Sequence, residues 1–166
     1  SIFAADLELP YTLTAAEMNL DLVSGILPSY VSQDGIAWNV DPLTLDPTTL
    51  KIQVFGQADP LILPSCGYVD FAYWHLSPVF SNGWALLGEV AKYIPVSTQR
   101  FSSLAFSQSS NSALTLQITG QPGEEVTVWA INTSEGLTPT AATCTVGPGG
   151  VVLMTLSTAT DPLCST

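Results

Sequence analysis

Apolar and polar residues alternate in several short segments, at residues 50–55, 114–118 and 126–128. A period of two places successive side chains on opposite faces of a β-strand, so each segment predicts a half-buried strand. Turn sequences rich in Pro and Gly separate them, among them Gln121-Pro122-Gly123 and Gly147-Pro148-Gly149-Gly150. Many short strands joined by such turns predict an all-β fold, an antiparallel β-sandwich of Greek-key or jelly-roll type.

The first 35 residues have a different pattern. Thr14-Ala15-Ala16-Glu17 fits a capping box, and Gly25 stands where a left-handed helix C-cap would fall. We therefore expect one short N-terminal helix, with an extended segment as the alternative because the stretch also contains weak helix formers. The predicted organisation is an N-terminal appendage over residues 1–35 and a β-sandwich domain over residues 36–166.

Residues 73–93 gather several rare residue types, including the chain's single histidine, His75. Asn82-Gly83 favours a type I′ turn, because both residues tolerate positive φ, and so predicts a β-hairpin. The return strand contains Ala85-Leu86-Leu87, which is apolar on both faces. We therefore expect a central strand that is covered on both sides.

Charged residues make up only 10% of the chain, and three basic residues face fourteen acidic ones, for a net charge of −11. Nucleic acid and anionic lipid are excluded as expected partners, because both are bound mainly through Lys and Arg. No apolar run reaches the roughly 18 residues of a membrane span. The neutral polar surface predicts a secreted, extracellular acidic protein, and Ser1 is interpreted as a processed or excised start.

The three cysteines, Cys66, Cys144 and Cys164, lack the close spacing of metal ligands, so no metal and no cofactor is expected. A disulfide between Cys144 and Cys164 would tie down the C-terminal tail. Cys66 would then carry a thiol or pair with a segment outside this chain; the alternative is three thiols. Asn132-Thr133-Ser134 is a glycosylation sequon, which makes Asn132 a candidate if the chain passes through a eukaryotic secretory route.

Catalytic signatures are weak in this sequence. His75 could meet Asp70 or Glu89, yet no nucleophile motif accompanies it. None of the fourteen carboxylates has a context that marks it as half of a glycosidase pair. We predict no catalytic residue and no enzyme activity for this chain alone, although it could be part of a glycoside hydrolase.

Saccharide binding suits the composition better. Aromatic faces stack on pyranose rings and neutral polar groups orient hydroxyls, whereas burial in a sandwich core is the alternative for any aromatic residue. The carbohydrate-binding candidates are Trp38, Tyr68, Tyr73, Trp74, His75, Trp84 and Trp129.

The segment at residues 61–101, with its SPVF and GWALLGEVAKYIPVSTQRF runs, resembles the C-terminal β-sandwich of the raffinose-synthase-like α-galactosidases. Ala85-Leu86-Leu87-Gly88 stands where that family has a Pro-Ile-Gly-Leu strand, and residues 114–123 match a later strand that enters a Gly-rich turn. Ser24-Gly25 and residues 30–35 are similar to a passage near the end of the family's catalytic barrel, apart from an inserted Gln33. The barrel with the catalytic carboxylates has no counterpart here, so no catalytic residue is carried over.

The resemblance implies a non-catalytic accessory β-sandwich domain of a secreted carbohydrate-active enzyme. Such a domain would pack against a catalytic domain or subunit and contact saccharide. A free-standing carbohydrate-binding module or lectin is one alternative, and it requires one exposed surface with at least two of Trp38, Tyr73, Trp74, Trp84 and Trp129. A structural or adhesive subunit of an extracellular assembly is another, and it predicts a long unpaired edge strand or a large apolar patch.

Overall fold

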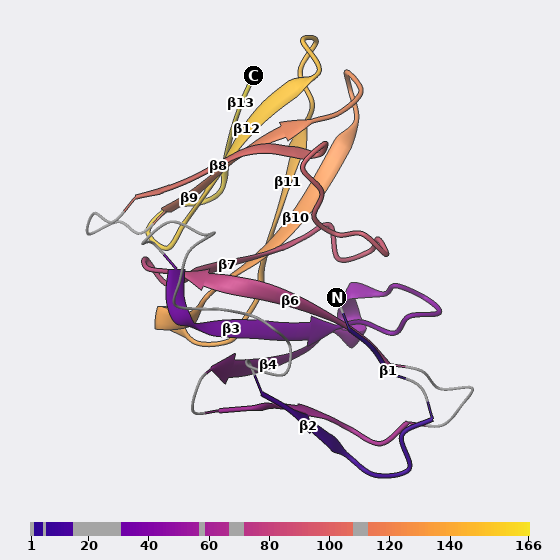
Figure 1. Cartoon of the computed structure of the whole chain (residues 1–166). Coiled ribbons are helices and arrows are strands. Elements are labelled where there is room, and N and C mark those ends of the chain that lie inside the picture. Colours follow the sequence, from indigo (N-terminus) through magenta and orange to yellow (C-terminus); the bar gives the residue numbers. More distant parts are fainter. Residues whose placement is uncertain (1, 5, 15–30, 57–58, 67–71, 108–112) are drawn as a thin grey trace. The chain divides into compact units, whose positions relative to one another are not determined.

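The computed structural model describes residues 2–4, 6–14, 31–56, 59–66, 72–107 and 113–166. Over these residues the regular structure consists of antiparallel β-strands and two short 3₁₀ helices, with no α-helix, which confirms the all-β prediction. The chain forms two compact units, Ser1–Ser81 and Asn82–Thr166 (Figure 1). The predicted N-terminal helix falls almost wholly outside the described residues, and the predicted boundary at residue 35 falls within a strand, β3.

The first unit contains two antiparallel sheets, of order β1-β6-β3-β4 and β2-β5. Its strands are β1 (Ile2–Ala4), β2 (Tyr11–Leu13), β3 (Val31–Asn39), β4 (Lys51–Gly56), β5 (Leu61–Leu63) and β6 (Ala72–Phe80), and η1 (Pro47–Thr49) precedes β4. The Gln53 side-chain amide, oriented by its partners, bonds both the N–H and the C=O of Ile62 and so ties β4 to β5.

Both faces of the larger sheet in this unit are buried where β3 pairs with β6. One face carries a core cluster of Ala37, Phe55, Leu61, Leu63 and Trp74. The other carries Ile36, Trp38, His75 and Ser77, which are also buried. Alternation along each strand therefore divides the apolar residues between two covered faces instead of one covered and one open face.

The second unit also contains two antiparallel sheets, of order β11-β10-β7 and β13-β12-β9-β8. Its strands are β7 (Trp84–Gly88), β8 (Phe101–Ser107), β9 (Ala113–Thr119), β10 (Glu125–Asn132), β11 (Thr140–Thr145), β12 (Val151–Ser157) and β13 (Leu163–Ser165), and η2 (Thr133–Glu135) follows β10. Leu114, Leu116 and Ile118 of β9 are fully buried, and the residues between them are partly exposed. The period-two pattern in the sequence is therefore confirmed here.

The turn between β9 and β10 has the form that Gln-Pro-Gly-Glu predicts. The Glu124 N–H donates to the Gln121 carbonyl over 2.9 Å, and Gly123 has φ 83°. A positive φ at the third position is the requirement of a type II turn, which Gly meets without strain.

The predicted hairpin at Asn82-Gly83 is wrong. β6 pairs with β1 and β3, whereas β7 pairs with β10, so the two strands lie in different sheets. The Asn82 amide nitrogen donates to the Ala113 carbonyl over 3.1 Å, and its oxygen accepts from the Trp84 N–H over 3.3 Å. These bonds turn the chain into a new sheet. β7 is buried along its whole length, as expected, but it lies at the end of its sheet and not at the centre.

Candidate functional site

The aromatic residues proposed from the sequence as carbohydrate-binding candidates fall into two groups, buried and partly exposed. Trp38, Trp74, Trp84 and His75 are all buried, at 1%, 5%, 2% and 6% exposure, and cannot form a surface platform. Tyr73 and Trp129 keep part of their side chains exposed, and they lie in different units. Tyr68 lies outside the described residues. Within the described chain, Trp129 in the second unit and Tyr73 in the first are therefore the candidates that a ligand can reach.

His75 is a packing residue of the first unit. Its ring stacks on Trp38, with ring centroids 4.3 Å apart, and meets the edge of Tyr73 at 4.5 Å. Burial lowers the pKa of His75 to about 4, so the imidazole is neutral at physiological pH. Glu89, one of the two carboxylates considered as its partner, instead forms ion pairs with Arg100 and Lys92. This environment does not resemble that of a general base.

Trp129 lies on a face of the three-stranded sheet in the second unit. Its register partners are Ala141 on β11 and Gly88 on β7, and a β-bulge follows it at Ala130. Ala141 offers only a methyl group and Gly88 no side chain, so neither partner covers the indole with a large group. Two residues earlier, the hydroxyls of Thr127 and Thr143 are hydrogen-bonded over 2.8 Å. We call Trp129, Ala141, Thr127 and Thr143 the Trp129 surface.

A loop that follows β7 presents apolar side chains to solvent. Tyr93, Ile94 and Val96 are 54%, 71% and 44% exposed, whereas Pro95 between them is buried. The Glu89 N–H donates to the Pro95 carbonyl over 2.9 Å. We call residues 93–96 the apolar loop.

Gly88 allows the apolar loop to approach the sheet. Gly88 has φ 80°, and a Cβ there would lie 2.2 Å from the Pro95 carbonyl oxygen and 2.6 Å from the Val96 side chain. Because register partners project to the same face of a sheet, the loop crosses the face that carries Trp129. The apolar loop and the Trp129 surface are therefore neighbours in one unit.

An ion-pair network anchors both ends of the segment that carries the loop. The Arg100 guanidinium donates to both carboxylate oxygens of Glu89, over 2.8 and 3.1 Å, and also binds Glu124. Burial alone raises the pKa of Glu89, but the hydrogen bonds from Arg100 and Lys92 outweigh this effect and lower it. The Arg100 hydrogen bonds also lower the pKa of Glu124 to about 2. Lys92 and Arg100 are the only cations of residues 82–166.

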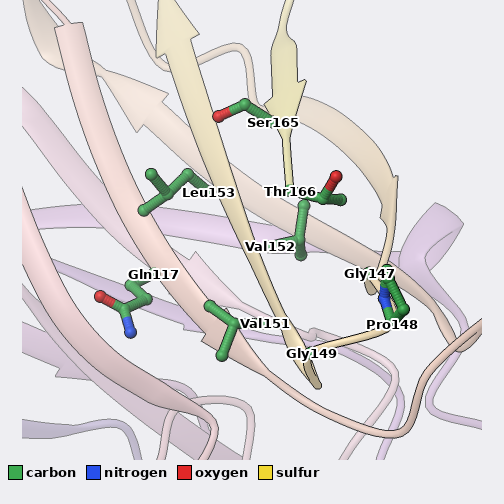
Figure 2. Close-up of a pocket in the computed structure, with 9 residues that line it drawn as sticks. All are labelled: Gln117, Gly147, Pro148, Gly149, Val151, Val152, Leu153, Ser165 and Thr166. Atoms are coloured by element: carbon green, nitrogen blue, oxygen red, sulfur yellow. The ribbon is translucent and has the colours of Figure 1, made fainter.

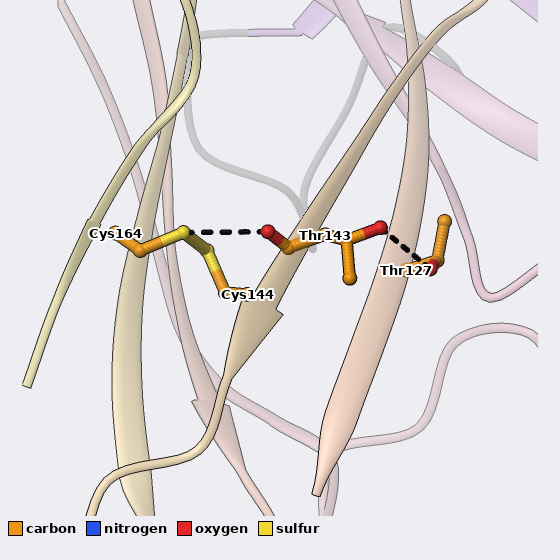
Figure 3. Close-up of a disulfide and its surroundings, with 4 residues drawn as sticks. All are labelled: Thr127, Thr143, Cys144 and Cys164. Carbon is orange, nitrogen blue, oxygen red and sulfur yellow. Dashed lines mark hydrogen bonds between the residues drawn. A yellow bond between two sulfur atoms is a disulfide. The ribbon is translucent and has the colours of Figure 1, made fainter.

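A disulfide joins Cys144 of β11 to Cys164 of β13, the pair expected from the sequence, with Cα atoms 5.8 Å apart (Figure 3). The bond therefore links the edge strands of the two sheets in this unit. Cys164 Sγ lies 3.5 Å from the carbonyl oxygen of Thr143, whose hydroxyl meets Thr127. The disulfide thus fixes the strand that supplies half of the Trp129 surface. Cys66 lies half-buried against the core of the first unit.

A shallow pocket of about 440 Å³ opens beside β12 and β13. Figure 2 shows Gln117 and Leu153 along one side of it, Ser165 and Thr166 on β13 and at the chain end, and the turn at Gly147 to Gly149 at its base. The lining carries no aromatic ring and no charged side chain. It therefore lacks an aromatic ring that could stack on a sugar and a charged side chain that could pair with an ion.

The sequon asparagine is enclosed. Asn132 is 7% exposed, and its side-chain oxygen accepts from the Ser134 N–H over 3.0 Å, which caps η2. An N-linked glycan needs an open path from the amide nitrogen to solvent. The fold gives Asn132 a structural role in ending β10 and starting η2.

The sequence did not single out the apolar loop or Arg100. Tyr93-Ile94-Pro95-Val96 is visible as an apolar run with a proline, but apolar runs are normally buried and this one is held outward by backbone bonds. Arg100 pairs with Glu89 and Glu124 through a network that links separate turns. No local pattern predicts such pairings.

Comparison with family models, with curated proteins and with solved structures gives no match. Within the described residues, no helix is long and apolar enough to cross a membrane. Over the same residues, no group of three or more His, Cys, Asp or Glu side chains is placed to hold a metal ion.

Proposed function

We propose that this chain is a non-catalytic accessory domain of a secreted carbohydrate-active enzyme, and that its second unit docks against a catalytic domain. The observation that carries the proposal is the apolar loop. Three of its four side chains are exposed, and no other four-residue segment of the described residues exposes as many large apolar side chains. Clustered exposed apolar groups are typical of association sites.

The loop is suited to docking because its conformation is already fixed. The Glu89–Pro95 backbone bond, the close approach at Gly88 and the Arg100–Glu89 ion pair hold it against the unit. A preorganised contact loses little conformational entropy when a partner binds. The partner face that meets Tyr93, Ile94 and Val96 would be apolar, with a rim of neutral or basic residues that tolerates the acidic charge of this chain.

We also propose that the two sheets of the second unit pack face to face as a β-sandwich. Buried residues alternate with exposed ones along β9 and β12, as they do in strands with one inner face. The Cys144–Cys164 bond between edge strands supports the same arrangement, since it requires the two sheets to lie close together.

Chemical cross-linking of the native protein from its source tests the docking proposal. The chain has only two lysines, and Lys92, whose side chain is 50% exposed, stands directly before the apolar loop. We expect amine cross-links from Lys92 to a domain with glycoside-cleaving activity, in the same polypeptide or in a bound subunit. Lys51, in the first unit, serves as the internal comparison. A native chain that sediments as a lone monomer or a homopolymer would contradict the proposal.

Two variants, compared in the isolated complex, test whether the apolar loop is the docking contact. Ile94→Asp places a charge at the tip of the loop and should weaken docking at least tenfold, or about 1.4 kcal/mol. Leu137→Asp changes another exposed apolar residue of the same unit, 44% exposed, and should leave docking unchanged. Equal effects of the two variants would rule out the loop as the contact.

A further inference from the structure

We infer that the Trp129 surface is a binding site for an uncharged saccharide, a subsite that rests on the proposed role in a carbohydrate-active enzyme. The site lies on the outer face of the sheet β11-β10-β7. It differs from the aromatic platform that the sequence suggested, because only one of those candidate rings takes part and its neighbours are hydroxyls.

Trp129 stands where the sheet face changes from covered to open. Along β10, Ile131 is fully buried, Trp129 is partly exposed and Thr127 is exposed. On the β11 side the register partner Ala141 offers only a methyl group, so the indole is open there, whereas on the β7 side Pro95 and Val96 of the apolar loop occupy the space above Gly88. An indole held in this way presents a ring surface for the C–H groups of a pyranose.

Hydroxyl groups follow the ring along the strands. Thr127 and Thr143 form a hydrogen-bonded pair in the next row, and Glu125 and Thr145 are register partners in the row after that. Each hydroxyl can donate and accept, so the pair can exchange its internal bond for bonds to sugar hydroxyls. At about 3.3 Å per residue, residues 125 to 129 span roughly 13 Å, the length of a short oligosaccharide.

The charge distribution selects an uncharged ligand. Both cations of the second unit are engaged with Glu89, and Arg100 also binds Glu124. The row next to the Trp129 surface contains Glu125, an acid, opposite Thr145. A uronic-acid or sulfated polymer would therefore meet repulsion without a compensating cation, whereas a neutral saccharide would not.

Affinity electrophoresis of the full chain tests this inference. Native gels that contain neutral galactomannan, xyloglucan or β-glucan are compared with gels that contain polygalacturonate and with gels that contain no polysaccharide. We expect retardation by at least one neutral polymer and none by polygalacturonate. Absence of retardation by all three neutral polymers, or equal retardation by polygalacturonate, would overturn the inference.

The chain offers a matched pair of hydroxyl variants. Thr127→Val with Thr143→Val removes the hydroxyls of the Trp129 surface, and we expect at least about a fivefold loss of affinity from the lost hydrogen bonds. Thr115→Val with Thr155→Val removes an equivalent pair, 3.2 Å apart, from the other sheet, and should leave affinity unchanged. Equal losses in the two variants would overturn the inference.

A third variant tests the ring without altering the core. Ala141→Leu puts a larger side chain beside Trp129 at an exposed position, and we expect it to reduce retardation while the circular dichroism spectrum stays unchanged. Retardation that persists in full would overturn the inference. A chain that is cross-linked at Lys92 to a glycoside-cleaving domain but binds no saccharide refutes only the saccharide site, and a monomer that binds saccharide refutes only the docking role.

Discussion

At the scale of single residues, His75 shows how environment decides the role of a reactive side chain. The sequence presents it as the chain's only imidazole, next to aromatic residues and within reach of acids. In the fold its ring stacks on Trp38, and the face that it shares with Ile36 and Ser77 is buried. Burial keeps the ring neutral at physiological pH, and the stacked ring contributes packing to the sheet.

Burial of His75 predicts a pH dependence of stability. Its pKa is about 4 in the folded chain and about 6.5 when unfolded, so the unfolded state binds the additional proton between these values. The contribution of His75 to the free energy of unfolding is therefore largest above pH 6.5, and it is lost as the pH drops toward 4. The slope approaches about 1.4 kcal/mol per pH unit, measurable by urea unfolding.

His75→Gln provides the control for this dependence. The variant lacks the titrating ring, so its free energy of unfolding should be flat between pH 6.5 and 5, whatever its absolute value. Below about pH 4.5, Glu89 and Glu124 add a second loss in both proteins, because their pKa values are lowered in the folded state. A wild-type curve that is flat above pH 5 would contradict the assignment.

Asn132 yields a second prediction at this scale. Because its side chain is enclosed and caps η2, we expect the folded protein to carry no glycan there, even after expression in a eukaryotic secretory system. Intact mass before and after endoglycosidase treatment should be identical. A mass shift that disappears in Asn132→Gln would show that the amide is accessible after all.

At the scale of elements, periodicity predicted strands well and pairing poorly. The alternating segments became β4, β9 and β10, and Gln-Pro-Gly-Glu became the expected turn. The chain does turn at Asn82-Gly83. However, the Gly83 carbonyl accepts a hydrogen bond from the hydroxyl of Thr133, 50 residues away in sequence. A dipeptide encodes local φ values and carries no information about which distant strand will be the neighbour.

Three glycines provide a graded test of backbone constraint. Gly88→Ala combines positive φ with a clash against the Pro95 carbonyl and should cost more than about 2 kcal/mol. Gly123→Ala has positive φ but open space and should cost about 1 kcal/mol. Gly149→Ala meets neither constraint and should change the free energy of unfolding by less than about 0.5 kcal/mol. Urea unfolding measures the order, and any other order would contradict the geometry.

The disulfide of the second unit should contribute measurably to stability. It closes a separation of 20 residues, for which chain-entropy arguments give about 3 kcal/mol. We expect reduction to lower the free energy of urea unfolding by about this amount. Cys66→Ser should show the same loss on reduction, whereas the double variant Cys144→Ser with Cys164→Ser should show none. A redox effect that follows Cys66 would contradict the assignment.

At the scale of the whole molecule, strand periodicity and turn sequences predicted the all-β class, but no local pattern marked a boundary at residue 81. The boundary at residue 81 follows from long-range pairings, with β6 bonded to β3 and β7 bonded to β10. The sequence also did not predict the exposure of the apolar loop or the ion pairs of Arg100. Both depend on contacts between separate turns, which form only in the folded chain. Exposure is a property of the folded molecule that residue type alone does not determine.

Charge gives a prediction for the molecule as a whole. With a net charge of −11 and Lys92 and Arg100 both engaged in ion pairs, we expect no retention on heparin at low salt. Any saccharide affinity should be nearly independent of salt, because no counterions are released. Affinity electrophoresis at low and high ionic strength measures this, and a steep decrease with salt would indicate an electrostatic contact.

The position of the Cys144–Cys164 bond also bears on how the protein matures. The two cysteines belong to edge strands of different sheets, and the native fold holds their sulfur atoms at bonding distance. Folding and oxidation therefore favour each other, because the fold keeps the two thiols together and the bond in turn stabilises the fold. In a reduced chain Cys164, which lies at the surface, is open to thiol reagents, so its labelling distinguishes reduced copies from oxidised ones.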